Sequence, residues 1–292
     1  MILFSLPDYH RFYRLNLSLL EIMDKEPEKF YEDIKIDSIY GSFPCIWNGG
    51  RYYDAQVSYD NIVMTVKPFM ERGISLRHTF TNCLLTQEHF SDTLCNKICE
   101  LTHSPLNGIN VTSPELKQYL EERYPQFYYM WSTTLGFTNI STIDEYSQNN
   151  LLVLDYSLNN KFEILKTLQH PNNIEILLGE TCIDNCPKRL EHYQHNSNCQ
   201  LYNTSSPYNC PFVPNQGFYQ TKECRQHWVT IDEIRSHYLP LGINKFKIAG
   251  RGRPVFEAIE NYVHYLVRPE WRDDIRNQLL LAILGEDRYM NC

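Results

Sequence analysis

Short apolar segments alternate with longer amphipathic segments along most of the chain. The short segments have the length and the Ile, Val, Leu, Phe and Tyr content of buried strands, and the longer ones carry apolar residues at helical spacing. We expect strands at 2–6, 34–40, 74–80, 108–111, 127–132, 151–155, 174–178 and 243–248. Strands that alternate with helices in this way indicate βαβ units and a parallel sheet.

Capping residues support several of the predicted helices. Thr142 with Glu145, and Thr230 with Glu233, have the spacing of capping boxes, in which two side chains satisfy free backbone amides at a helix start. We expect helices at 15–30, 59–71, 91–101, 114–124, 161–168 and 254–267, together with helices that begin at the two capping boxes.

The count of about eight strands favours a (β/α)8 barrel over an open doubly wound sheet. The 292 residues are close to the roughly 250 of such barrels, so we expect one α/β domain of the TIM-barrel type over 1–292, with residues 1–73 either completing or covering the barrel. Chemistry in this fold lies at the C-terminal strand ends. Those ends carry His78, Asn82, Asn110, 132–134, Asp155, 180–182 and 247–251.

Charge and apolar content exclude some classes of protein. The chain has 27 Lys and Arg against 35 Asp and Glu, a net charge of −8, which argues against affinity based on nucleic-acid phosphates. No segment approaches the roughly 18 consecutive apolar residues of a membrane span, and the first twenty residues lack the pattern of an export signal. The ten cysteines are therefore expected to be thiols or metal ligands in a reducing, cytoplasmic location.

A cysteine-rich insertion over 179–226 follows the strand predicted at 174–178. It contains Cys182, Cys186, Cys199, Cys210 and Cys224. Closely spaced thiolates at a strand end are typical of zinc or iron–sulfur sites, and either of the last two cysteines would supply a fourth ligand. The alternative is that all five are reduced thiols packed as small apolar side chains, which is the interpretation we favour for Cys95 and Cys99.

Basic side chains at the last strand suggest an anion site. Lys247, Arg251 and Arg253 bring three positive charges to this strand and its loop, where a guanidinium group can hold a carboxylate with two hydrogen bonds. The alternative is a solvated basic turn. Glu180, beside the cysteines, is a candidate acid or base, or an ion-pair partner of Lys247.

Histidine and asparagine side chains add further candidates. His78 and Asn82 lie at the end of ISLRHTFTN, although a single histidine on a strand is more often a hydrogen-bonded structural residue. His192 and His195 lie near the cysteines and are alternative metal ligands, or members of a short helix after Cys186.

Three stretches in the same order resemble one family. NVTSPELKQYLEERYPQFYYMWSTTLGFTN is similar to a strand–helix–strand with an SP…L…yP…STQ…N pattern, IEILLGETC to an EvFvhGalC strand, and GINKFKIAGRGRP to a GvdsLKIeGR strand. These patterns belong to the collagenase-like peptidases of family U32. The family includes oxygen-independent hydroxylases of ubiquinone synthesis and prephenate-linked proteins of tRNA and rRNA hydroxylation. The resemblance covers roughly residues 74 to 270.

The resemblance implies a (β/α)8-like barrel that carries a [4Fe–4S] cluster. The implied cluster ligands are Cys182, Cys186, Cys199 and Cys224, with Cys210 as a spare. The candidate catalytic residues are Glu180, Lys247, Arg251, Asn82 and His78. The implied activity is oxygen-independent hydroxylation, or a related redox modification, of an aromatic or nucleobase substrate, with an anionic co-substrate such as prephenate bound by Lys247 and Arg251.

Other classes stay open beside this one. The family is historically labelled peptidase, although the chain contains neither an HExxH helix nor a GxSxG turn. A zinc-stabilised, non-catalytic binding protein would use the same cysteines. A radical-SAM enzyme would need a third cysteine where Thr102 or Arg189 stands. The amphipathic stretch 275–284 packs either on its own barrel or on a partner, such as a homologous subunit.

Overall fold

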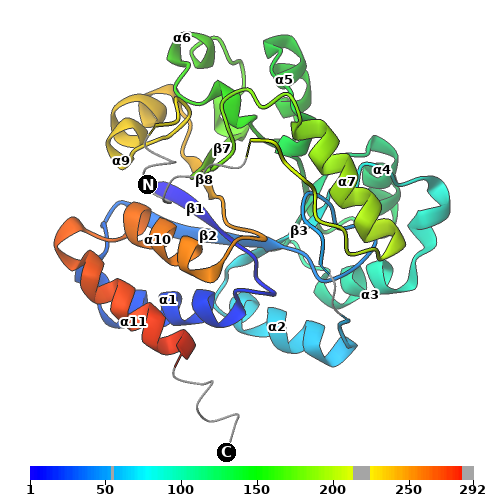
Figure 1. Cartoon of the computed structure of the whole chain (residues 1–292), viewed down its shortest axis with the longest axis horizontal. Coiled ribbons are helices and arrows are strands. Elements are labelled where there is room, and N and C mark those ends of the chain that lie inside the picture. Colours follow the sequence, from blue (N-terminus) through cyan, green and yellow to red (C-terminus); the bar gives the residue numbers. More distant parts are fainter. Residues whose placement is uncertain (54–55, 213–223, 285–292) are drawn as a thin grey trace, which may run out of the picture.

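Eight parallel strands close into a barrel in the order β1 to β8, surrounded by helices (Figure 1). The computed structural model describes residues 1–53, 56–212 and 224–284. The strands are β1 (Ile2–Pro7), β2 (Ile34–Gly41), β3 (Ser75–Phe80), β4 (Gly108–Val111), β5 (Tyr128–Trp131), β6 (Leu151–Val153), β7 (Ile174–Leu178) and β8 (Lys245–Ile248). Each predicted strand corresponds to an observed one, and the predicted single α/β barrel is confirmed.

Helices follow the strands as the sequence predicts, with differences at some starts. They are α1 (Tyr13–Lys25), α2 (Tyr59–Glu71), α3 (Thr93–Thr102), α4 (Pro114–Arg123), α5 (Ile140–Ser147), α6 (Phe162–Leu165), α7 (Arg189–Tyr202), α9 (Ile231–Glu233), α10 (Val255–Leu266) and α11 (Arg272–Leu284). The capping box of Thr230 and Glu233 is confirmed at the start of α9. The one predicted at Thr142 is wrong, because α5 begins earlier and Asn139 caps it by accepting a hydrogen bond from the Thr142 amide.

Shorter helical turns connect these elements. The 3-10 turns are Pro27–Lys29, Gln87–Ser91, Thr133–Leu135, Tyr156–Leu158, Pro171–Asn173, Leu239–Leu241 and Pro269–Trp271, and a π-helical turn spans Ile234–Tyr238.

Residues 1–73 complete the barrel. They contain β1 and β2, and β1 pairs with β2 on one side and with β8 on the other, where Leu3 faces Lys245 and Ser5 faces Lys247. The ring closes through this pairing of the first and last strands.

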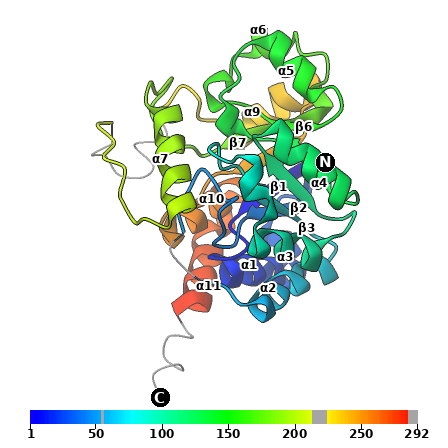
Figure 2. The same cartoon turned by 90° about the vertical axis from the view of Figure 1, so that its right-hand side faces the viewer.

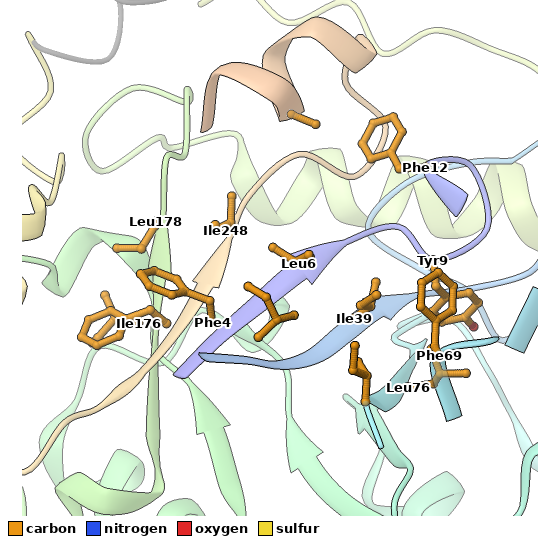
Figure 3. Close-up of a cluster of buried hydrophobic side chains, with 14 of the residues drawn as sticks. Phe4, Leu6, Tyr9, Phe12, Ile39, Phe69, Leu76, Ile176, Leu178 and Ile248 are labelled. Atoms are coloured by element: carbon orange, nitrogen blue, oxygen red, sulfur yellow. The ribbon is translucent and has the colours of Figure 1, made fainter. Parts of the chain in front are cut away.

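The outer face of the barrel is apolar and packs under the helices. Figure 3 shows part of this layer, which includes Phe4, Leu6, Ile39, Ile176 and Ile248. All five side chains are fully buried. Burial of a large apolar side chain contributes about 1.5–3 kcal/mol, so this layer between strands and helices is the main source of stability.

The inside of the barrel is polar. Ser38 on β2 donates a hydrogen bond to Ser5 on β1 over 2.9 Å. Arg77 on β3 reaches Glu175 on β7, with 2.5 Å between Nη1 and Oε1, although the two strands are not neighbours. This ion pair therefore crosses the barrel interior. Arg77 also contacts Asp37 and Tyr128, so a charged layer occupies the N-terminal end of the barrel.

Helix α7 lies at one end of the barrel, outside the ring of helices (Figure 2). It contacts the 48–50 loop through Asn196, whose Nδ2 donates to the Gly50 carbonyl over 3.0 Å.

Helix α11, the predicted amphipathic stretch, packs against α1 and α10 with Ile275 and Leu279 fully buried. None of the helices in the described ranges is long and apolar enough to cross a membrane.

Candidate active site

Two adjoining cavities lie at the C-terminal ends of the strands. The mouth cavity, of about 70 Å³, is lined by residues of β2, β3, β4, β7 and β8 and of the loops that follow the strands. The thiol cavity, of about 320 Å³, lies between the β7 end, α7 and the loop after β8. Arg51, Glu180 and Tyr193 line both cavities, so the two adjoin and a ligand in one would be close to the other.

Lys247 points into the mouth cavity from β8 and is 5% exposed. Its Nζ lies 3.8 Å from the centroid of the Tyr40 ring, and within the described part of the chain no hydrogen bond or salt bridge engages it. Burial lowers the pKa of Lys247 to about 7, with the Glu175 carboxylate opposing and Arg251 and Arg77 adding to the effect. The neutral amine is therefore far more populated near neutral pH than in an ordinary lysine.

Glu180 forms part of the wall between the two cavities. Its Oε1 accepts hydrogen bonds from the backbone amides of Thr181 and Cys182, over 2.8 and 3.0 Å, and lies 4.0 Å from Arg253 Nη2. Burial alone would raise the pKa of Glu180, but the neighbouring guanidinium groups and the Cys182 amide lower it to about 2. Glu180 is therefore a carboxylate at neutral pH. It pairs with Arg253 and not, as one alternative had it, with Lys247.

Arg251 lines the mouth cavity, but its hydrogen bonds hold the loop after β2 in place. Nη1 donates to Asn48 Oδ1 over 2.8 Å and also to Thr79 Oγ1, and Nη2 donates to the Gly49 carbonyl. The guanidinium is thus engaged by protein acceptors. Arg51, from the same loop, keeps Nη2 without a hydrogen bond to any described residue, after Nε and Nη1 bind the Arg251 and Gly50 carbonyls.

The five cysteines of the insertion do not all lie together. Cys182, Cys186 and Cys210 line the thiol cavity. Cys199 lies on α7, where its Sγ is 3.5 Å from His195 Nε2 and 3.7 Å from the Ser206 carbonyl oxygen, and it lines neither cavity. Cys224 is exposed.

The donor set of the thiol cavity suits an anionic metal centre in its chemistry. Four cationic side chains share the cavity with the three thiols, and positive charge stabilises thiolates. They are Arg51, Lys188, Arg189 and Arg253. Burial and the Glu180 carboxylate raise the pKa of Cys182 to about 11, so a metal would have to displace the thiol proton on binding. As arranged, no three His, Cys, Asp or Glu side chains among the described residues are close enough to hold one metal ion.

Asn82 and His78 lie outside both cavities. Asn82 connects three segments, because its Nδ2 donates to the Ile46 and Ser197 carbonyls and its Oδ1 accepts from the Leu84 amide. His78 is fully buried on the outer face of β3, with Nδ1 2.7 Å from Tyr9 Oη and Nε2 2.8 Å from Thr102 Oγ1. Alternate β3 side chains point to opposite faces, so Arg77 and Thr79 face inward and His78 does not. Asn82 and His78, both predicted as catalytic residues, therefore make structural contacts outside the two cavities.

His78 predicts a specific acid sensitivity. Burial lowers its pKa to about 3, whereas an unfolded histidine has about 6.5, so the unfolded chain binds one more proton between these values. Stability is therefore complete above pH 6.5 and falls with decreasing pH, by roughly 1.4 kcal/mol per unit from this residue. The free energy of unfolding in urea is measured at several pH values between 6.5 and 4. Its slope against pH should be smaller in His78→Gln than in the unsubstituted protein, by the equivalent of about one proton. An unchanged slope would contradict this account.

Some residues of the site had only a weak sequence signal. Tyr40, Arg51 and Arg189 were not predicted as site residues. Arg51 follows the paired glycines Gly49 and Gly50 in the loop after β2, and functional residues are common in such loops. Arg189 forms an ion pair with Asp155, 2.7 Å from Nη1 to Oδ2, and its guanidinium carbon lies 4.0 Å from the Tyr156 ring centroid.

Comparisons with known proteins bear on the fold. The sequence matches no family model and no curated protein. The structure is similar to that of the U32 peptidase Mk0906, with a TM-score of 0.56 and 15% sequence identity over 87% of this chain and 95% of that one. At this identity the likeness concerns the fold. It is the fold expected from the family that the sequence resembles.

Proposed function

We propose that the chain is an iron–sulfur enzyme of the U32 type, in which a cluster in the thiol cavity adjoins a substrate pocket at the barrel mouth. The observation that carries this proposal is that three cysteine side chains line a cavity sharing Arg51 and Glu180 with the mouth cavity. The reaction would be an oxygen-independent hydroxylation or related redox modification of an aromatic or nucleobase substrate. One carboxylate end of an anionic co-substrate such as prephenate would bind in the mouth cavity.

The proposed ligand set differs from the one that the resemblance implies. Cys182, Cys186 and Cys210 would hold the cluster, because they line one cavity. Cys224 would be the fourth ligand, since Cys199 lines neither cavity and contacts His195 and Ser206. A bound cluster would supply one-electron transfer at the edge of the substrate pocket.

The side chains of the mouth cavity have separate roles in this proposal. Arg51 Nη2 would bind the carboxylate of the co-substrate, because this nitrogen in the cavity wall donates to no acceptor among the described residues. Arg251 would position the loop that carries Arg51, through its bond to the Gly49 carbonyl. Glu180, ionised at neutral pH, would accept a proton from a substrate hydroxyl.

Metal content tests the proposal directly. Protein purified without oxygen should be brown and contain about four irons per chain with matching sulfide. Cys182→Ser, Cys186→Ser and Cys210→Ser should each lose nearly all of the iron, whereas Cys83→Ser, which changes an exposed cysteine outside the insertion, should keep it.

Two results would contradict parts of this assignment. Colourless protein with one zinc per chain would exclude the redox function and leave a zinc-stabilised protein. Full iron in Cys210→Ser together with loss in Cys199→Ser would replace the proposed ligand set by one that contains Cys199.

A peptidase-like hydrolase is the second candidate. The observation that favours it is the similarity of the fold to that of the U32 peptidase Mk0906. Glu180 would then activate water at the barrel mouth. Cleavage of a denatured protein substrate by iron-free protein, lost in Glu180→Gln, would favour hydrolysis over the redox proposal.

A further inference from the structure

We propose that Lys247 is a nucleophile that forms an imine with a small 2-oxo acid bound in the mouth cavity. This inference rests on the proposed function in one respect, that the mouth cavity is the substrate pocket. It requires neither a cluster nor a redox step.

No hydrogen-bond acceptor among the described residues stabilises the ammonium form of Lys247. Its Nζ lies over the Tyr40 ring without a hydrogen-bonded partner in the described ranges. The side chain is 5% exposed, and its amine opens to the cavity. Desolvation disfavours the ammonium form, which is how proteins prepare lysines that attack carbonyl groups.

Unsatisfied polar atoms in the same cavity indicate a ligand with hydrogen-bonding groups. Asn110 Oδ1 and Thr81 Oγ1 have no hydrogen-bond partner among the residues that the structure describes, and the two side chains are 1% and 2% exposed. Leaving such buried atoms unpaired is unfavourable, and a ligand that bonds to them would remove this cost. Asn110 Oδ1 can accept from a hydroxyl, and Thr81 Oγ1 can donate to an oxygen.

The carboxylate of a 2-oxo acid has a matching partner. Arg51 lines the mouth cavity, and its Nη2 lacks a hydrogen-bonded acceptor in the described ranges. A guanidinium donor at one side and an amine at the other would bind the two ends of a molecule with a carboxylate next to a carbonyl. The cavity volume of about 70 Å³ suits a two- or three-carbon acid such as glyoxylate or pyruvate.

The proposed step is an ordinary condensation. The lone pair of the neutral Nζ attacks the carbonyl carbon, and the carbonyl π electrons move to oxygen. A proton passes from nitrogen to that oxygen and gives a carbinolamine, whose new hydroxyl is the donor that Asn110 Oδ1 would accept. The hydroxyl takes one proton from solvent and leaves as water, which gives a protonated carbon–nitrogen double bond on Lys247.

Reductive trapping tests this step. The full chain is incubated with pyruvate or glyoxylate and sodium borohydride, which delivers hydride to the imine carbon and fixes the adduct as a secondary amine. Peptide mass spectrometry should find the adduct on Lys247. At pH 7 we expect at least about a hundredfold more labelling there than on any surface lysine, because an ordinary lysine with a pKa near 10.4 is almost entirely protonated.

Matched variants identify the lysine. Lys247→Arg keeps a cation and should lose the label. Lys245→Arg should keep it, because Lys245 lies two residues earlier on β8 and its Nζ donates to the Asn172 carbonyl instead of entering the mouth cavity. Iron content and the urea unfolding midpoint of both variants establish that they are folded.

The pH profile separates a buried nucleophile from general surface reactivity. Labelling of Lys247 should be half-maximal near pH 7 and level above it, while surface labelling continues to rise. The charged groups that set this profile are Glu175 on β7, Arg77 on β3 and Arg251 after β8. Burial raises the pKa of Tyr40 on β2, so it stays neutral throughout.

Equal labelling of Lys247 and surface lysines, or undiminished labelling of Lys247→Arg, would overturn the proposal. Its failure is distinguishable from failure of the iron–sulfur function. Iron-free protein that labels at Lys247 would contradict the cluster alone, and iron-loaded protein that does not label would contradict the nucleophile alone.

Discussion

Replacing Arg77 with methionine is expected to lower the free energy of unfolding by about 3–5 kcal/mol. The change leaves the Glu175 carboxylate, 1% exposed, inside the barrel without the guanidinium that pairs with it. It also removes the contacts of Arg77 with Asp37 and Tyr128. A buried charge without a partner costs more than the pair contributes, and Glu175 Oε2 already lacks a hydrogen bond to any part of the chain that the structure describes.

Two further variants separate this explanation from a general loss of packing. Arg77→Met combined with Glu175→Leu should recover a large part of the loss, because no carboxylate is then stranded. Arg235→Met removes a pair at the surface, where Arg235 and Asp33 are 34% and 41% exposed, and should cost less than about 1 kcal/mol. Urea unfolding measures all three. A double variant no more stable than Arg77→Met would refute the argument.

A single methyl group at Gly49 is expected to disrupt the barrel mouth. A Cβ at this position would lie 2.1 Å from the Thr81 carbonyl oxygen and 2.4 Å from the Asn82 nitrogen, both of them backbone atoms at the end of β3. The loop would have to move away, which breaks the bond from the Asn82 amide to the Trp47 carbonyl and the one from Arg251 to Gly49. We expect a loss of about 3 kcal/mol or more.

Gly73→Ala is the control for Gly49→Ala. Gly73 has a φ of +70° and open space around it, so alanine there should cost about 1–2 kcal/mol of backbone strain and leave the mouth intact. Hydrogen exchange of the Asn82 amide adds a local measurement, since its protection should fall in Gly49→Ala alone. Equal losses of stability in the two variants would show that the close approach of Gly49 is not restrictive.

The sequence predicted the fold better than the site, and β3 shows why. The six residues of SLRHTF are all buried. The alternation of polar and apolar positions therefore predicts a strand, but it does not show which face of the strand points into the barrel. The polar positions Ser75, Arg77 and Thr79 point into the barrel, which is the reverse of a surface strand. His78 was therefore expected at the mouth, although its side chain points to the helices.

The cysteines show a second limit. Spacing along the chain identified the segment that carries the thiols, but not which of them meet. Cys199 lies on α7 and outside the cavity, and the chain then returns far enough for Cys210 to line the same cavity as Cys182. This return depends on how α7 packs against the 48–50 loop, through hydrogen bonds such as that from Asn48 to Gln200. The spacing of residues along the sequence does not predict such long-range hydrogen bonds.

The closure of the barrel has a consequence for biosynthesis. Because Leu3 pairs with Lys245, the first strand keeps one unpaired edge until nearly the whole chain has left the ribosome, on the order of tens of seconds at ordinary translation rates. An unpaired strand edge can pair with other chains and aggregate. We therefore expect the yield of soluble protein to depend on chaperones that shield nascent chains.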